Sequence, residues 1–89
     1  MDATAGKLLN AMQAKCLARI ESGESLESAM IFGHIEGLHS DVVPRWDFDV
    51  LYAACEALAD AGYIHFDCSG EVFLTNNKSA LCKSNLPVQ

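Results

Sequence analysis

The sequence predicts one α+β domain in which three helices are followed by a β-hairpin. Apolar residues recur at helical spacing over residues 4–21 and again over residues 48–62. Two short runs rich in β-branched and aromatic residues, YIHF and EVFLT, flank the turn-forming residues DCSG. The chain has 89 residues, 51% of them hydrophobic and 20% charged, which suits a single folded domain with one modest core.

The first helix is expected over about residues 4–21. Gly23 follows it at the position where helices commonly end in a left-handed residue. Steps of one, three and four residues place six apolar side chains on one face: Leu8, Leu9, Met12, Cys16, Leu17 and Ile20. We expect this face to pack into the core.

The second element has two interpretations. Ser25 can cap a helix that begins there and carries Met30 on its apolar side. Gly33 and Gly37 would weaken that helix, so its end is not defined by the pattern. The alternative is a strand around residues 30–35, and the sequence alone leaves both open.

The third helix follows a connecting segment, residues 39–45, and Asp47 can cap it. Gly62 ends it, and the positions between show the clearest helical period in the chain: Phe48, Leu51, Cys55 and Leu58. In the hairpin, alternation directs four side chains inward: Ile64, Phe66, Val72 and Leu74. Residues 76–89 are expected to form a turn and a tail, so a core fold over about 4–75 lies within a single domain spanning 1–89.

The net charge of −6 is unevenly distributed along the chain. Residues 21–71 contain eleven of the twelve acidic residues and only one base, Arg45. The remaining cations lie toward the two ends of the sequence: Lys7, Lys15, Arg19, Lys78 and Lys83. The central part of the chain should therefore repel nucleic acid and attract basic partners.

Several classes of function find little support. The four cysteines are too far apart for the usual zinc-binding spacing, so we expect no metal site, and nothing indicates a cofactor. The scattered glycines form no phosphate-binding loop. Cys68 and His65 lie near each other in the predicted hairpin, but no third group completes a catalytic set. We therefore expect a protein that is not an enzyme.

A membrane location is not expected either. No apolar run approaches the roughly 18 residues that a bilayer span requires. The N-terminal residues MDATAGKLLN lack the basic flank and apolar stretch of a secretion signal. We expect a cytoplasmic protein, in which the cysteines would stay reduced.

The segment LYAACEALADAGYIHFDCSGEVFLT resembles the third helix, short exit, strand, wing and strand of the winged helix-turn-helix superfamily. The resemblance covers about residues 4–75 and implies a winged-helix-like fold. It does not imply one function, because this fold serves both DNA binding and protein binding. DNA-binding members place the third helix in the major groove, where basic or amide side chains reach the base edges.

The sequence departs from the DNA-binding pattern on the third helix. At 100° per residue, Asp49, Glu56 and Asp60 fall within about 60° of one another, opposite the apolar face. The wing adds Asp67 and Glu71, so this surface could not neutralise phosphates. Exposed helix faces are often charged only for solubility, and that alternative stays open. The expected partner-binding residues are Trp46, Asp47, Asp49, Tyr52, Glu56, Asp60, Asp67 and Glu71, with Trp46, Tyr52 and Phe73 as apolar anchors.

The expected function is that of a non-catalytic module that binds a basic surface of a nucleic-acid-handling protein or complex. In size and charge the chain is similar to phage-encoded inhibitors of bacterial CRISPR complexes. The alternative is a winged-helix transcriptional regulator that binds DNA through an unusual basic patch on the first helix and the tail. A homodimeric scaffold is a third possibility, and the sequence does not distinguish a monomer from a homodimer.

Overall fold

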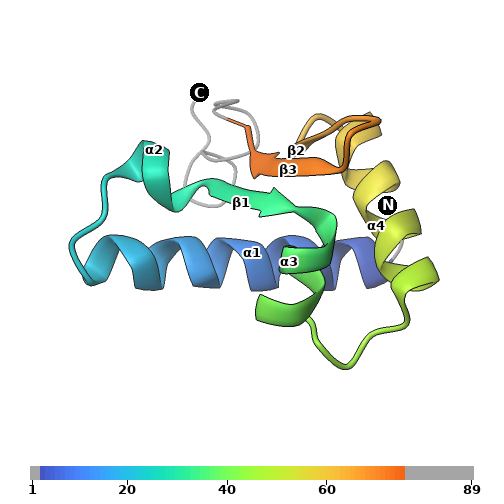
Figure 1. Cartoon of the computed structure of the whole chain (residues 1–89), viewed down its shortest axis with the longest axis horizontal. Helices are drawn as coiled ribbons and strands as arrows, with labels where there is room; N and C mark the ends of the chain where they lie inside the picture. The colour runs from blue at the N-terminus through green and yellow to red at the C-terminus, as the bar shows by residue number, and fades with distance from the viewer. Residues whose placement is uncertain (1–2, 76–89) are drawn as a thin grey trace.

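The computed structural model describes residues 3–75, so the turn and tail expected over residues 76–89 lie outside the described part. The helices are α1 (Ala3–Glu21), α2 (Leu26–Ala29), α3 (Ile35–Asp41) and α4 (Phe48–Asp60). The strands are β1 (Ile31–His34), β2 (Ile64–Phe66) and β3 (Glu71–Leu74) (Figure 1). The α+β class is confirmed, but the described residues contain one helix and one strand more than predicted.

The prediction of a second helix is wrong over residues 31–34, where β1 forms. Ser25 does cap a helix, because its Oγ accepts a hydrogen bond from the Ser28 amide at 3.1 Å, but α2 is only four residues long. Gly33 has a φ of 73°, a conformation that favours glycine, and it lies where the register between β1 and β3 shifts. The alternative of a strand near residues 30–35 is therefore the correct one.

The three strands form an antiparallel sheet in the order β1-β3-β2. The predicted hairpin is present, with Ile64 opposite Leu74 and Phe66 opposite Val72. β1 pairs with the other edge of β3, with Ile31 opposite Phe73. In Figure 1, α1 runs along the longest dimension of the molecule, α4 stands beside its N-terminal half, and α2 follows its C-terminal end.

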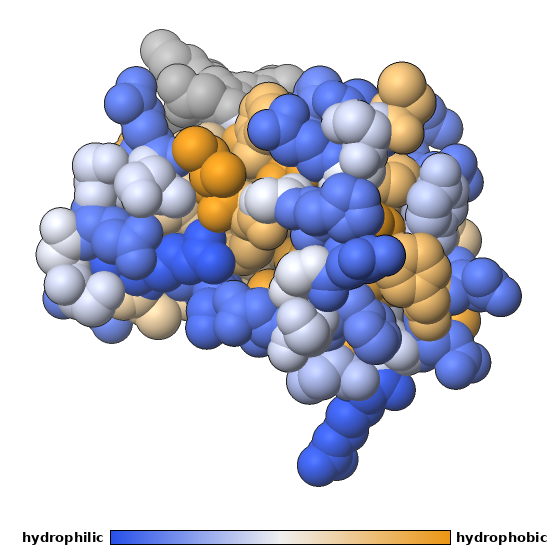
Figure 2. All heavy atoms as spheres, viewed as in Figure 1, coloured by the Kyte–Doolittle hydropathy of each residue, from blue (hydrophilic) through white to orange (hydrophobic). Residues whose placement is uncertain are grey.

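The core includes residues from every helix and strand: Ala5, Leu8, Met12, Cys16, Ala29, Met30, Phe32, Ile35, Leu38, Val43, Leu51, Ala54, Cys55, Leu58, Ile64, Val72 and Leu74. Around it, hydrophilic residues cover most of the face shown in Figure 2, with hydrophobic residues visible near its middle. Leu8, Met12, Cys16 and three of the four predicted apolar positions of α4 are buried as expected.

Five predicted core residues are more exposed than the pattern indicated. Leu17 and Ile20 are exposed because, at 100° per residue, they lie about 180° and about 120° around α1 from Leu8, away from its buried side. Phe48, on the first turn of α4, is exposed, and its ring lies edge-on to the His39 ring with the two centroids 6.0 Å apart. Leu9 and Phe66 are only partly buried at the margin of the core.

Candidate functional site

The acidic stripe of α4 lies on the surface. Leu51, Cys55 and Leu58 are buried on one side of the helix. Asp49, Glu56 and Asp60 are exposed on the other, as the helical period predicts. No ion pair within residues 3–75 involves any of these three carboxylates. Their negative charge is therefore presented to solvent, and no lysine or arginine among residues 3–75 pairs with it.

The hairpin turn is organised by Asp67. One carboxylate oxygen of Asp67 accepts hydrogen bonds from the Ser69 amide at 3.0 Å, the Ser69 hydroxyl at 2.6 Å and the Glu71 amide at 3.2 Å. The other oxygen lies 3.0 Å from Nε2 of His65, whose ring stacks on Phe73 with a centroid distance of 4.4 Å. Asp67 therefore has a structural role in the turn as well as a charge on its surface.

These contacts set the ionisation of Asp67. The Ser69 hydroxyl, and then His65, hold the pKa of the Asp67 carboxyl well below its usual range. A lowered folded-state pKa means that the ionised form stabilises the fold above the unfolded-state pKa of about 3.9, and that this contribution is lost as the pH falls.

Replacing Asp67 by asparagine is therefore expected to reduce stability more at neutral pH than in acid. Both proteins would be unfolded with urea at pH values from 7 down to 3. The difference in their free energy of unfolding should shrink as the pH falls below about 4, where the unfolded wild-type chain takes up a proton. A difference that stays the same at every pH would show that the Asp67 charge is not preferentially stabilised in the fold.

A surface groove runs between α4 and the hairpin turn. Its volume is about 520 Å³, and it is lined by Tyr52, Glu56, Ala59, Asp60, Phe66, Asp67 and Cys68. Four of these were expected partner-binding residues: Tyr52, Glu56, Asp60 and Asp67. Tyr52 and Phe66 pack edge to face at its wall, with centroids 5.1 Å apart and planes at 80°.

The other expected partner-binding residues lie outside the groove. Asp47 stands at the N-cap position of α4, but its side chain makes no capping hydrogen bond, contrary to expectation. Trp46 is partly buried against the core, and its carbonyl oxygen lies 2.6 Å from Nε2 of His39. Asp49 on α4 and Glu71 on β3 are exposed without lining the groove.

Sequence reasoning did not identify Phe66 and Cys68 as part of this site. The period-two alternation assigned Phe66 to the core with Ile64, but Phe66 is the last residue of β2 and is only partly buried. Its position next to the turn was the available signal, because a strand end is covered on fewer sides. Cys68 is exposed, whereas Cys16 and Cys55 are buried as predicted and burial raises the pKa of the Cys55 thiol to about 12.

One group of side chains in the described residues could accommodate a cation. His65, Asp67 and Glu71 each offer a ligand atom, and these atoms lie within 4.8 Å of one another. Asp67 is already satisfied by its hydrogen bonds to Ser69, Glu71 and His65. The turn therefore needs no ion to hold its shape.

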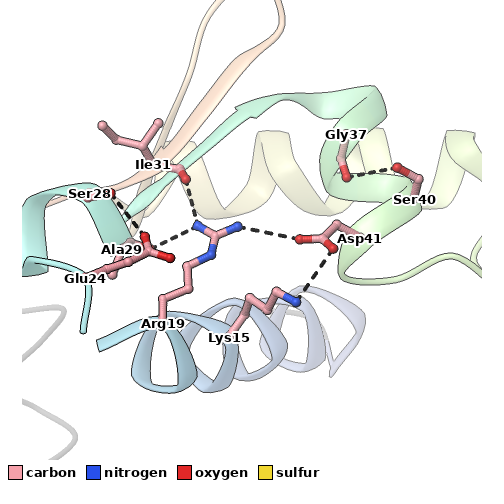
Figure 3. A network of polar contacts seen from close by, with 9 residues as sticks. All are labelled: Lys15, Arg19, Glu24, Ser28, Ala29, Ile31, Gly37, Ser40 and Asp41. Carbon is pink, nitrogen blue, oxygen red and sulfur yellow. Dashed lines mark hydrogen bonds and ion pairs between the residues drawn. The ribbon is translucent and has the colours of Figure 1, made fainter. Parts of the chain in front are cut away.

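Two cations of α1, Lys15 and Arg19, are engaged within the fold. Figure 3 shows the Lys15 ammonium 3.6 Å from one carboxylate oxygen of Asp41 and the Arg19 guanidinium 3.5 Å from the other. Arg19 also donates hydrogen bonds to the carbonyl oxygens of Ala29 at 3.2 Å and Ile31 at 2.8 Å. Two of the three cations that could have formed a basic patch on this helix are thus held by internal partners.

Comparison with family models, with curated proteins and with solved structures finds no match to this chain. None of the helices within residues 3–75 has the length and apolar character needed to cross a bilayer. The function of the protein must therefore be inferred from the geometry of the groove and of the acidic stripe.

Proposed function

We propose that this protein is a non-catalytic acidic module that binds a basic surface of a nucleic-acid-handling protein or complex. The observation that supports the proposal is the stripe formed by Asp49, Glu56 and Asp60, three exposed carboxylates that no ion pair within residues 3–75 neutralises. Such a surface attracts cationic partners and speeds their association. A phage-encoded inhibitor of a CRISPR complex would be a protein of this kind, because a compact negative body can occupy a cleft built for phosphate.

The proposal includes a winged-helix-like architecture. It is supported by the succession of α4, Gly62 with a φ of 86° at the helix end, and the β2–β3 hairpin. In this assignment α4 corresponds to the helix that DNA-binding members place in the major groove. Because the exposed side of α4 is acidic in this chain, the same surface would face a cationic protein.

A DNA-binding regulator is the alternative, and it requires cations on an outer surface. Phosphate contacts from lysine and arginine supply most of the affinity for nucleic acid. Lys15 and Arg19 are held by Asp41 and by backbone carbonyls. A duplex that bound Lys15 or Arg19 would therefore have to displace these contacts, which argues against a basic patch built on these two residues.

Reversing the charge of the stripe tests the proposal. The variant combines Asp49→Lys, Glu56→Lys and Asp60→Lys, and binding would be measured by fluorescence anisotropy with a labelled basic peptide at a salt concentration of about 0.15 M. We expect affinity to fall about tenfold or more, since attraction becomes repulsion at the docking surface. Capture from a cell lysate with both forms would then identify the proteins that depend on the stripe.

A matched control separates the effect of the stripe on binding from the effect of net charge. Glu21, Glu27 and Glu36 are exposed acids on other elements, and replacing all three by lysine changes the net charge by the same amount. This control should lose much less affinity than the stripe variant. Equal losses in both variants, or binding of the wild-type protein to duplex DNA at micromolar concentration and the same salt, would contradict the proposal.

A further inference from the structure

The groove between α4 and the hairpin turn combines two kinds of recognition chemistry. The aromatic rings of Tyr52 and Phe66 form part of its wall, and the carboxylates of Glu56, Asp60 and Asp67 form another part. Tyr52 is exposed on α4, as are Phe48 and Val50, but of these three only Tyr52 lines the groove. An edge-to-face pair leaves at least one ring face uncovered by the other ring, so an aromatic surface remains open to a ligand.

Arginine is the side chain that this combination fits best. Its guanidinium is planar and permanently charged, stacks on aromatic faces, and donates paired hydrogen bonds to carboxylates. A lysine ammonium is also attracted by the charges, but it is a compact point charge and cannot stack. In the groove, aromatic rings can stack on the face of a guanidinium while carboxylates accept hydrogen bonds from its N–H groups.

The groove is also held in shape before any partner arrives. Tyr52, Glu56 and Asp60 project from successive turns of α4, whose opposite side is anchored in the core. Asp67 is fixed by its hydrogen bonds to Ser69, His65 and the Glu71 amide. A preformed site loses less conformational entropy on binding than a flexible one.

We propose that this groove binds an arginine side chain presented by the basic partner, with the guanidinium against Tyr52 and Phe66 and its N–H groups directed at Glu56 and Asp60. The inference rests on the proposed function, since it names the side chain by which that partner is recognised. The aromatic surface continues along α4 from Tyr52 to Phe48, whose ring centroids are 6.4 Å apart. The ligand is therefore an arginine within a polypeptide segment that lies along the helix.

The test compares two labelled peptides of equal length and charge, one alternating arginine with glycine and the other lysine with glycine. Anisotropy titrations would use the whole protein, the variant Tyr52→Ala and the variant Glu56→Gln. Val50→Ala is the matched control, because Val50 is as exposed as Tyr52 (42% against 43%) on the same helix but does not line the groove. Circular dichroism would verify that each variant is folded.

Cys68 provides a second measurement that reports on the groove itself. It is exposed and lines the groove, so its alkylation rate, read by peptide mapping, falls when the groove is occupied. We expect the wild-type protein to prefer the arginine peptide about threefold or more and to show slower Cys68 alkylation in its presence. Tyr52→Ala should abolish the preference and Glu56→Gln should weaken binding of both peptides, while Val50→Ala should match the wild type.

The outcomes distinguish this inference from the proposed function. If the stripe reversal removes peptide binding but Tyr52→Ala behaves like Val50→Ala, or if saturating arginine peptide leaves Cys68 alkylation unchanged, the groove is not an arginine site and the acidic module stands. If the stripe reversal itself leaves binding intact, the proposed function fails and the arginine site fails with it.

Discussion

Replacing Leu8 by alanine is expected to lower the free energy of unfolding by about 2–5 kcal/mol. Leu8 lies in the half of α1 that packs against α4, and its side chain is fully buried. Truncation removes apolar contacts and leaves a cavity that rigid neighbours fill only in part. A domain of this size has a total stability of about 5–15 kcal/mol, so this single change could remove a large share of it.

Leu17 on the same helix supplies the control. Leu17 was expected on the same face as Leu8, but nine residues at 100° each place it about 180° around the helix, and 60% of it is exposed. Leu17→Ala should therefore change stability by no more than about 0.5 kcal/mol. Urea titrations of both variants would measure the two losses, with unchanged slopes showing that the unfolded states are comparable. Similar losses at the two positions would mean that the side of α1 that carries Leu17 is buried in solution.

The second large effect is expected at Arg19, where Arg19→Ala should cost about 1–3 kcal/mol. The guanidinium links the end of α1 to two other elements, because it donates hydrogen bonds to the carbonyl oxygens of Ala29 and Ile31 (Figure 3). It also lies 4.6 Å from the centroid of the Phe32 ring. Removing it leaves those carbonyls without this donor and uncovers one side of Phe32. Arg19→Lys should recover little of the stability that Arg19→Ala loses, because one ammonium cannot reach the same set of partners.

Lys15 is the matched comparison for Arg19. Both cations lie near Asp41, at 3.6 and 3.5 Å, but the Lys15 side chain is 39% exposed and the Arg19 side chain 20%. An exposed ion pair contributes little, so Lys15→Ala should cost less than about 1 kcal/mol. Thermal and urea unfolding of both variants would check this order. If the two variants were equally destabilised, the ion pair with Asp41 and not the carbonyl contacts would be the main contribution of Arg19.

Local patterns predicted the elements that depend on interactions between residues close together in the sequence. The periods of α1 and α4 reflect side chains three and four positions apart, and Gly23 and Gly62 do adopt the left-handed conformation expected at the helix ends, with φ of 109° and 86°. The hairpin was predictable because its strands are joined by one short turn. The same helical period predicted which residues of α4 are exposed.

Strand β1 illustrates what these patterns could not decide. Its backbone hydrogen bonds are made with β3, about forty residues further along the chain, in pairs such as Ile31 with Phe73. Nothing within residues 30–35 signals that partner, so the strand remained only the alternative to a second helix.

The amino-acid sequence by itself determined the α+β class, the positions of α1, α4 and the hairpin, and the acidic character of the exposed side of α4. The tertiary structure alone decided that β1 is a strand, that Arg19 links α1 to other elements, and that Tyr52 and Phe66 share a groove with Glu56 and Asp60. The reason is that periodicity and turn chemistry act between near neighbours. Pairing, coverage and groove formation depend on residues that only folding brings together.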